Sequence, residues 1–181
     1  LYQTVFARRP GAVASPTAGL HFDEVLLKQI EAKGVEILFV TLHVSYGTFQ
    51  PVASEDLSQH KIYEEYFDIP EETAERINFA KADGRRVIAC GTTVVRTLES
   101  VAANSIPAEI ESKEGNTRLF IYPPYEFKIA DAMITNFHLP RTTLLMLTSA
   151  FTGHELLMEA YREAIEKHYR FYSYGDAMLI L

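Results

Sequence analysis

The sequence predicts an α/β fold in which a mostly parallel sheet is flanked by helices. Three observations favour this fold class. Apolar and β-branched runs typical of buried strands alternate along the chain with segments of helical periodicity. One of these runs passes through a single glycine directly into a helical segment, a junction typical of parallel sheets. The chain has 181 residues, 48% of them hydrophobic, which is enough to bury the core of one such domain.

The first half of the chain alternates expected helices with expected strands. Apolar residues recur at helical spacing after Asp23, which predicts the helix start, and Gly34 predicts its end. Pro70, followed by two glutamates, favours the first turn of a second helix that Gly84 stops. We therefore expect helices at about 23–33 and 70–83, strands at 35–42, 62–69 and 86–90, and a loop at 43–54.

The second half continues the same alternation. A helix is expected directly after Gly91, and a surface loop rich in polar residues follows it. Two short apolar runs then predict strands, two helical segments follow, and the chain closes on a last apolar run. The expected bounds are helix 92–103, loop 104–117, strands 119–122 and 132–135, helices 143–151 and 155–168, and strand 176–181.

Composition excludes several classes of protein. The net charge of −7 argues against broad, non-specific nucleic-acid binding but leaves room for a local basic patch. The single cysteine, Cys90, excludes an internal disulfide and lies in an apolar run, as a buried thiol does. The six histidines show no helical ligand spacing, so no metal site is expected. No apolar stretch reaches the roughly 20 residues that span a bilayer, and we expect a cytoplasmic protein without membrane contact.

Two segments at the ends of expected strands are the first candidates for a site. Gly91-Thr92-Thr93 opens a helix whose free N–H groups attract an anion, although, for this segment taken alone, a plain helix cap made by the hydroxyl of Thr92 or Thr93 is the more ordinary interpretation. In Thr135-Asn136-Phe137-His138-Leu139-Pro140, the polar side chains face the crevice where open α/β sheets bind ligands. With Phe137 turned towards the core, Asn136 and His138 are expected to point into one crevice.

Three further segments carry residues with possible chemistry. His43 follows a buried strand and suits either a general base or a core hydrogen bond. In Pro16-Thr17-Ala18-Gly19-Leu20-His21-Phe22, small residues permit close backbone approach, and His21 fits a structural role. The aromatic stretch around Arg170 suits either stacking on nucleobases or a structural Arg170–Asp176 pair.

Taken together, these segments resemble the S-adenosylmethionine:tRNA ribosyltransferase-isomerases of queuosine biosynthesis. The resemblance spans the whole chain in the order of the family. Its segments are Tyr2-Gln3-Thr4-Val5, Pro16-Thr17-Ala18-Gly19-Leu20-His21-Phe22, Thr41-Leu42-His43-Val44, Gly91-Thr92-Thr93, Arg96-Thr97-Leu98-Glu99, Thr135-Asn136-Phe137-His138-Leu139-Pro140 and Tyr174-Gly175-Asp176-Ala177-Met178-Leu179-Ile180. Departures from the family pattern occur at Gln50, at 60–65 and at Pro124.

The resemblance implies that residues 1–181 form the carboxy-terminal part of the family's α/β catalytic domain. Members of the family are nearly twice this length, and their amino-terminal half and β-barrel insertion have no counterpart in this sequence. The chain also opens on Leu1 rather than a methionine, like the interior of a longer protein. We therefore expect a partial chain.

The implied activity moves the ribosyl unit of S-adenosylmethionine, the co-substrate, onto a tRNA whose anticodon carries 7-aminomethyl-7-deazaguanine. The products are epoxyqueuosine, adenine and methionine, with no prosthetic group or metal, and we expect a monomer. Candidate catalytic residues are His43, His138, Glu99 and Asp176. Candidate substrate-binding residues are Gly91, Thr92, Thr93, Arg96, Thr135, Asn136, Phe137 and Arg170.

Two other interpretations stay open at this point. One is a different enzyme that uses S-adenosylmethionine, such as a methyltransferase, although the Gly-x-Gly-x-x-Gly signature is missing. The other is an inactive fragment that only binds RNA. Release of adenine rather than S-adenosylhomocysteine separates the first alternative from a ribosyl transfer.

Overall fold

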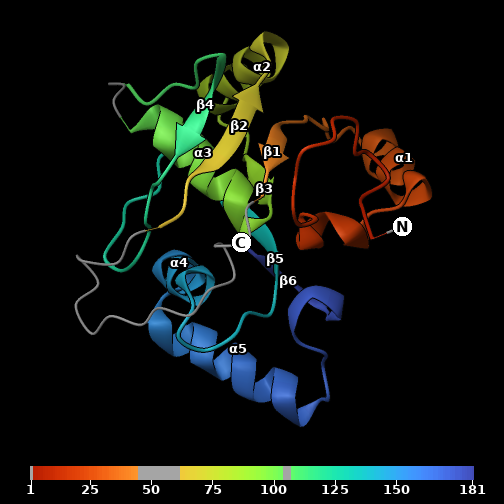
Figure 1. Cartoon of the computed structure of the whole chain (residues 1–181), viewed down its shortest axis with the longest axis vertical. Helices are drawn as coiled ribbons and strands as arrows, with labels where there is room; N and C mark the ends of the chain where they lie inside the picture. Colours follow the sequence, from red (N-terminus) through yellow and green to blue (C-terminus); the bar gives the residue numbers. More distant parts are fainter. Residues whose placement is uncertain (1, 45–61, 104–106) are drawn as a thin grey trace.

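The computed structural model describes residues 2–44, 62–103 and 107–181. These residues form mixed α/β structure, with two three-stranded sheets flanked by five α-helices (Figure 1). The α/β class predicted from the sequence is confirmed. Most of the expected loop at 43–54, and the departures at 50 and 60–61, lie outside the described residues.

The two sheets differ in how their strands pair. In the first sheet, β2 (Glu65–Ile69) pairs antiparallel with both β1 (Thr41–His43) and β4 (Lys113–Thr117). In the second, β5 (Ala132–Asn136) runs parallel to β3 (Ile88–Cys90) and antiparallel to β6 (Ala177–Ile180).

The expectation of a mostly parallel sheet was wrong, because only one of these four strand pairs is parallel. In the second sheet, the reason is the number of helices between neighbouring strands. A single helix returns the chain to the end of the sheet where it started, whereas β5 and β6 are separated by two, α4 and α5. The chain therefore reaches β6 from the opposite end.

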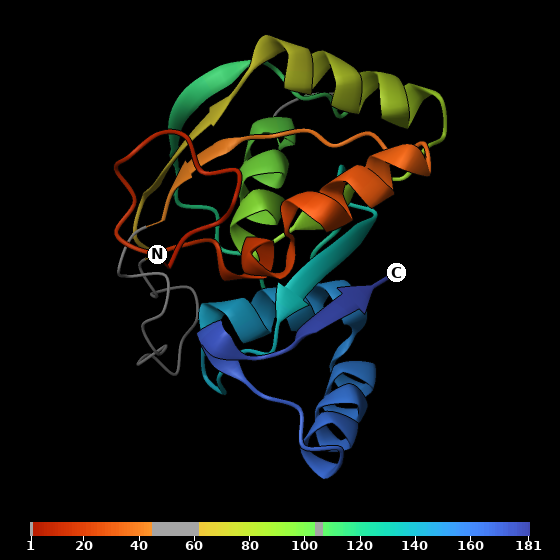
Figure 2. The same cartoon turned by 90° about the vertical axis from the view of Figure 1, so that its right-hand side faces the viewer.

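Helix α3 (Thr92–Ala102) lies between the two sheets (Figure 2). Its residues Leu98 and Ala102 are buried in one core cluster with Phe67 and Ile69 of the first sheet. One turn earlier, Val95 is buried in a second cluster with Met133 of the second sheet. The helix thus contributes to both cores, and its placement fixes the sheets relative to each other.

The other helices follow the sequence expectations closely. The carboxylate of Asp23 caps α1 (Glu24–Ala32) by accepting the Leu26 N–H at 2.7 Å, and α2 (Glu71–Ala82) begins directly after Pro70. Helix α4 (Thr143–Thr152) and helix α5 (His154–Glu166) are joined only by Gly153, whose φ is +86°. Glycine is favoured there because other residues adopt that backbone conformation at a cost.

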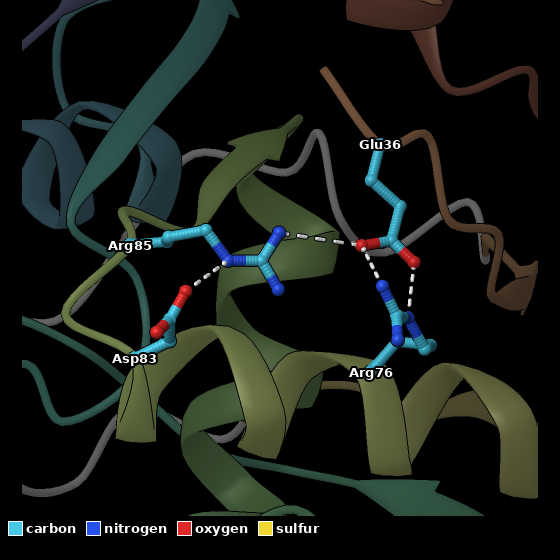
Figure 3. A network of polar contacts seen from close by, with 4 residues as sticks. All are labelled: Glu36, Arg76, Asp83 and Arg85. Carbon is cyan, nitrogen blue, oxygen red and sulfur yellow. Dashed lines mark hydrogen bonds and ion pairs between the residues drawn. The ribbon is translucent and has the colours of Figure 1, made fainter. Parts of the chain in front are cut away.

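The strand expected at 35–42 is mostly an extended segment, and only its end enters β1. Side chains hold this segment in place of a neighbouring strand. Glu36 forms ion pairs with Arg76 and Arg85, and Arg85 also pairs with Asp83 (Figure 3). Three residues further on, the Phe39 carbonyl accepts a hydrogen bond from the Thr73 hydroxyl at 2.9 Å. The β-branched composition therefore indicated extended backbone correctly but not its pairing.

Two expectations between α3 and β5 were also wrong. Strand β4 occupies part of the expected loop 104–117, and its polar composition concealed it because most of this edge strand faces solvent. The expected strand 119–122 is packed rather than paired: Ile121 is buried, and the rings of Phe120 and Tyr122 lie 4.9 Å apart. Apolar content alone therefore placed the strand a few residues too late.

Glu99 anchors the chain just before β5. This fully buried side chain accepts the backbone N–H groups of Lys128, Ile129 and Ala130 at 2.9, 2.9 and 3.1 Å. Burial and the neighbouring Glu99 carboxylate raise the pKa of Tyr125 to about 12, so the phenol keeps its proton beside Glu99. The Glu99 carboxylate thus accepts the three backbone N–H groups in place of backbone carbonyls.

We expect Glu99→Ala to lower the free energy of unfolding by about 3 kcal/mol or more, because three buried N–H groups lose their acceptor. Glu99→Gln should fall between the wild type and Ala, since one amide oxygen remains. Denaturant titration measures both variants, with the exposed Glu75→Ala on α2 as the matched control. Equal midpoints for Glu99→Ala and Glu75→Ala contradict the assignment.

Candidate functional site

A pocket lies where the carboxyl ends of β3 and β5 meet two 3₁₀ turns, η1 (Thr17–His21) and η4 (Tyr172–Tyr174). The sequence placed two of its candidate segments at these strand ends, and the structure brings them together. The predicted residues that line the pocket are Gly91, Thr92, Thr93, Thr135, Asn136, Phe137 and His138.

The β3–α3 junction forms one wall of the pocket. Gly91 has a φ of +102°, which favours glycine, and its N–H donates to the Ile134 carbonyl at 2.8 Å. Among the described residues, no side chain caps α3 at Gly91, so the hydroxyl cap considered as an alternative for Thr92 or Thr93 is not formed there. The first turn of α3 therefore keeps backbone N–H groups without a side-chain acceptor.

The end of β5 supplies a histidine in a fixed environment. His138 Nε2 lies 2.7 Å from the Thr135 hydroxyl, and the His138 backbone N–H donates to the Tyr161 hydroxyl at 2.7 Å. Burial lowers the pKa of His138 to about 4, so the imidazole is uncharged at neutral pH. Between these groups, Phe137 packs on Phe171 and Tyr161 with ring centroids 5.0 and 5.3 Å away. Phe137 therefore turns towards the core, as expected.

Turn η4 forms a rim that the sequence analysis did not assign to the pocket. Tyr172 has a φ of +69°, uncommon for a residue with a side chain, and its N–H donates to the Phe137 carbonyl at 3.0 Å. Its own carbonyl accepts from Asn136 Nδ2 at 3.2 Å. Two consecutive residues at the end of β5, Asn136 and Phe137, thus hold the rim by hydrogen bonds. Ser15, Thr142 and Ser173 also line the pocket and were missed, since isolated hydroxyls give no sequence signal.

The remaining candidates on β1 and α3 lie outside the pocket lining. The His43 ring packs against Tyr66, with centroids 4.7 Å apart, and against the backbone of Gly11, where a Cβ atom would approach within 2.6 Å. Arg96 donates to Glu65 at 2.5 Å and to the Leu119 carbonyl at 2.9 Å, in a pair whose side chains are 6% and 1% exposed. Their proposed chemical roles stay predictions, as does that of Glu99.

Contacts between Arg170 and Asp176 close the segment that contains η4, the rim of the pocket. The Asp176 carboxylate accepts the Arg170 backbone N–H at 2.7 Å and its guanidinium at 3.2 Å, and these contacts lower the pKa of Asp176. Gly175 is required between them because a Cβ atom would lie 2.4 Å from the Arg170 carbonyl oxygen. The structural alternative for the Arg170–Asp176 pair is therefore formed, and direct roles for both residues stay predictions.

Within residues 2–44, 62–103 and 107–181, no group of three or more His, Cys, Asp or Glu side chains is placed to hold a metal ion. In the same ranges, none of the helices combines the length and the apolar character needed to cross a bilayer.

The comparison with protein families decides what kind of protein carries this pocket. The model of a family described as queuosine biosynthesis protein matches residues 1–180. The chain belongs to this family. Its curated relatives include S-adenosylmethionine:tRNA ribosyltransferase-isomerases from Aquifex aeolicus, 58% identical, and from Thermus thermophilus, 59% identical, each over 99% of this chain.

A solved structure agrees with this assignment. The crystal structure of an S-adenosylmethionine tRNA ribosyltransferase from Thermotoga maritima is 46% identical and superposes with a TM-score of 0.73 over 91% of this chain. The chain spans about half the length of the curated relatives, 52% and 51%, and 51% of the solved chain. The family resemblance stated from the sequence is confirmed, and the residues that carry it form both the pocket and the contacts that hold it.

We expect Arg96→Ala to lower the free energy of unfolding by about 3–5 kcal/mol, because it leaves Glu65 buried without its main cationic partner. The exposed Arg162→Ala on α5 is the matched control and should stay within about 0.5 kcal/mol of the wild type. Denaturant titration of both variants checks this. An Arg96→Ala protein of unchanged stability that loses affinity for S-adenosylmethionine would return Arg96 to the ligand-binding set.

The environment of His138 predicts a pH dependence of stability. The pKa of His138 is about 6.5 in the unfolded chain and about 4 in the folded chain. Between these two pH values, the unfolded chain therefore binds a proton that the folded chain does not. Stability from this group is complete above about pH 6.5 and falls by about 2–3 kcal/mol as the pH drops towards 4. Thermal melts of wild type and His138→Gln between pH 4 and 7 measure it. The difference between the two curves should change over this window, and a constant difference contradicts the prediction.

Proposed function

We propose that this chain provides part of the active site of an S-adenosylmethionine:tRNA ribosyltransferase-isomerase. The reaction transfers and isomerises the ribosyl unit onto the aminomethyl group of a 7-deazaguanine base in the tRNA anticodon. Epoxyqueuosine, adenine and methionine are the products. The observation that carries the proposal is the pocket itself, because two segments of the family pattern that lie far apart in the sequence line it together. The relatives named for this activity support the same conclusion.

The pocket has features that suit S-adenosylmethionine as a co-substrate. Small side chains of η1, including Ala18, leave room beside Gly91 at the β3–α3 junction. The uncapped first turn of α3 offers backbone N–H groups to a ligand oxygen. Such donors are suited to the ribose hydroxyls of the donor molecule.

The reaction requires a base near the sulfonium and a proton donor for the departing adenine. The sulfonium charge acidifies the adjacent C–H bond, so a neutral base within reach can remove that proton. His138 is uncharged at neutral pH and sits in the pocket lining, beside the Thr135 hydroxyl. Burial lowers the pKa of His138 to about 4, which weakens it as a base but makes its protonated form a better proton donor to the departing adenine.

His43 is the weaker candidate for the same role. Its neighbours Leu42 and Val44 line the pocket, whereas its own ring lies against Gly11 and Tyr66. Side chains of successive strand residues point to opposite faces, which accounts for the difference. Access of His43 to a ligand therefore requires its ring to leave this packing.

The rim of the pocket fits an RNA substrate. Tyr172 and Tyr174 are 49% and 78% exposed, and the Tyr174 ring lies 4.8 Å from that of Tyr2. Exposed aromatic rings beside a cation such as Arg170 can stack on unpaired bases without a broadly basic surface. This accommodates tRNA on a chain with a net charge of −7.

We expect His138→Ala to lower turnover at least about tenfold, because positioned proton transfer contributes about 10²–10⁴ in rate. His138→Gln should fall between, since it keeps a partner for Thr135. The readout is adenine release in the presence of tRNA carrying the aminomethyl-deazaguanine base, with a melting curve for each variant. The exposed His154→Ala at the start of α5 is the matched control.

The assay uses this chain beside the Thermus thermophilus relative as a full-length reference. Normal adenine release from folded His138→Ala removes His138 from the chemistry and favours His43. Formation of S-adenosylhomocysteine instead of adenine contradicts the proposed function itself and indicates a methyl transfer.

A further inference from the structure

Asn136 is a buried amide that is only half used by the protein. The residue is 2% exposed and lines the pocket. Its Nδ2 lies 3.2 Å from the Tyr172 carbonyl oxygen, 3.4 Å from the Gly175 carbonyl oxygen and 3.2 Å from His21 Nε2. Its Oδ1 is buried and has no hydrogen-bond partner in the described part of the chain.

The orientation of this amide is fixed by its partners. Backbone carbonyls only accept hydrogen bonds, so the amide nitrogen, and not the oxygen, must face Tyr172 and Gly175. Since the nitrogen side is occupied by η1 and η4, the oxygen is the part of the amide that remains for a ligand. A buried acceptor without a donor is unfavourable, and such groups are satisfied in nearly all folded proteins.

A second asparagine in the same chain shows the contrast. Asn78 on α2 donates from Nδ2 to the Ile110 carbonyl at 2.8 Å and accepts the Ile110 N–H on Oδ1 at 2.8 Å. Both ends of that amide are paired within the protein. Asn136 differs in that its buried Oδ1 has no hydrogen-bond partner among the described residues.

The chemistry of the pocket restricts the donor that Asn136 can meet. Among the described residues that line it there is no Asp, Glu, Lys or Arg, and His138 is uncharged at neutral pH. An ammonium group placed there would be buried without a counter-charge, which is costly. A neutral N–H donor on a flat, largely apolar ring meets no such penalty.

We propose that this pocket holds an adenine-type base, whose exocyclic amino group donates a hydrogen bond to Asn136 Oδ1. The inference rests on the proposed function and assigns the adenine end of S-adenosylmethionine, rather than its ammonium end, to this part of the site. Asn136 is then a specificity-determining residue that selects a 6-amino purine over purines without that donor.

The test is calorimetric titration of the chain with adenosine, purine riboside, inosine and guanosine. Purine riboside lacks the amino group and should bind about three- to tenfold more weakly than adenosine, as expected for one lost hydrogen bond. Inosine and guanosine present a carbonyl oxygen at the same place, facing another acceptor, and should bind at least about tenfold more weakly. Equal affinities across the series, or no binding of adenosine to the folded chain, overturn the proposal.

Variants locate the discrimination at Asn136. Asn136→Ala should bind adenosine and purine riboside with equal affinity, whereas the matched control Asn78→Ala should keep the wild-type ratio. Should Asn136→Ala not fold, because Nδ2 also holds η4, the nucleoside series on the wild type decides alone. A ratio that persists in folded Asn136→Ala overturns the assignment.

Failure of this proposal can be told from failure of the proposed function. Adenine release from tRNA-dependent turnover with no preference for 6-amino purines leaves the ribosyl transfer standing and removes the Asn136 contact. Selective binding of adenosine without adenine release supports the contact and counts against the transfer.

Discussion

The structure depends on charged side chains buried at the two ends of one helix turn. Arg96 and Glu99 both project from α3, a helix with a sheet on each side, and both are almost fully buried. Arg96 joins α3 to β2 through Glu65, and Glu99 joins it to the backbone just before β5. Burying such charges is tolerated only where each is paired and hydrogen-bonded, so the pairs restrict how the two sheets can pack on α3.

This restriction reaches the pocket through the start of the same helix. Gly91 pairs with Ile134 of β5 and at once begins α3, so the register of β3 on β5 and the direction of α3 are set together. The residues after Gly91 and those at the end of β5 can then face one space. The rim is positioned from the other side, since Asn136 and Phe137 hold Tyr172 in a backbone conformation uncommon for a tyrosine. Conformations of this kind persist where surrounding contacts over-determine them, often at functional sites.

Local signals explain which parts of this arrangement were predictable. The Asp23 cap, Pro70 and Gly91 act over a few residues, and the helices they bound were expected nearly where they occur. Strand pairing depends on partners far along the chain: 35–40 is extended yet held by Glu36, and the polar strand β4 pairs with β2 although its composition suggests a loop. The site divides in the same way. Sequence reasoning found Asn136 and His138 because they follow a strand, but it could not separate them from Arg96 and Glu99, whose partners only the fold brings near.

The absence of charged side chains from the described pocket lining, in a chain rich in charge elsewhere, also bears on how a cationic co-substrate would be handled. A carboxylate beside the sulfonium would stabilise the ground state, and binding that stabilises ground and transition states equally does not raise the turnover rate. In the binding mode proposed above, a lining of hydroxyls, an amide and an uncharged imidazole would instead recognise the base by hydrogen bonds and leave the sulfonium charge available to acidify its neighbouring C–H bond. The same burial that lowers the pKa of His138 keeps its imidazole uncharged at neutral pH, so it adds no positive charge beside the sulfonium, but it also makes the imidazole a weaker base.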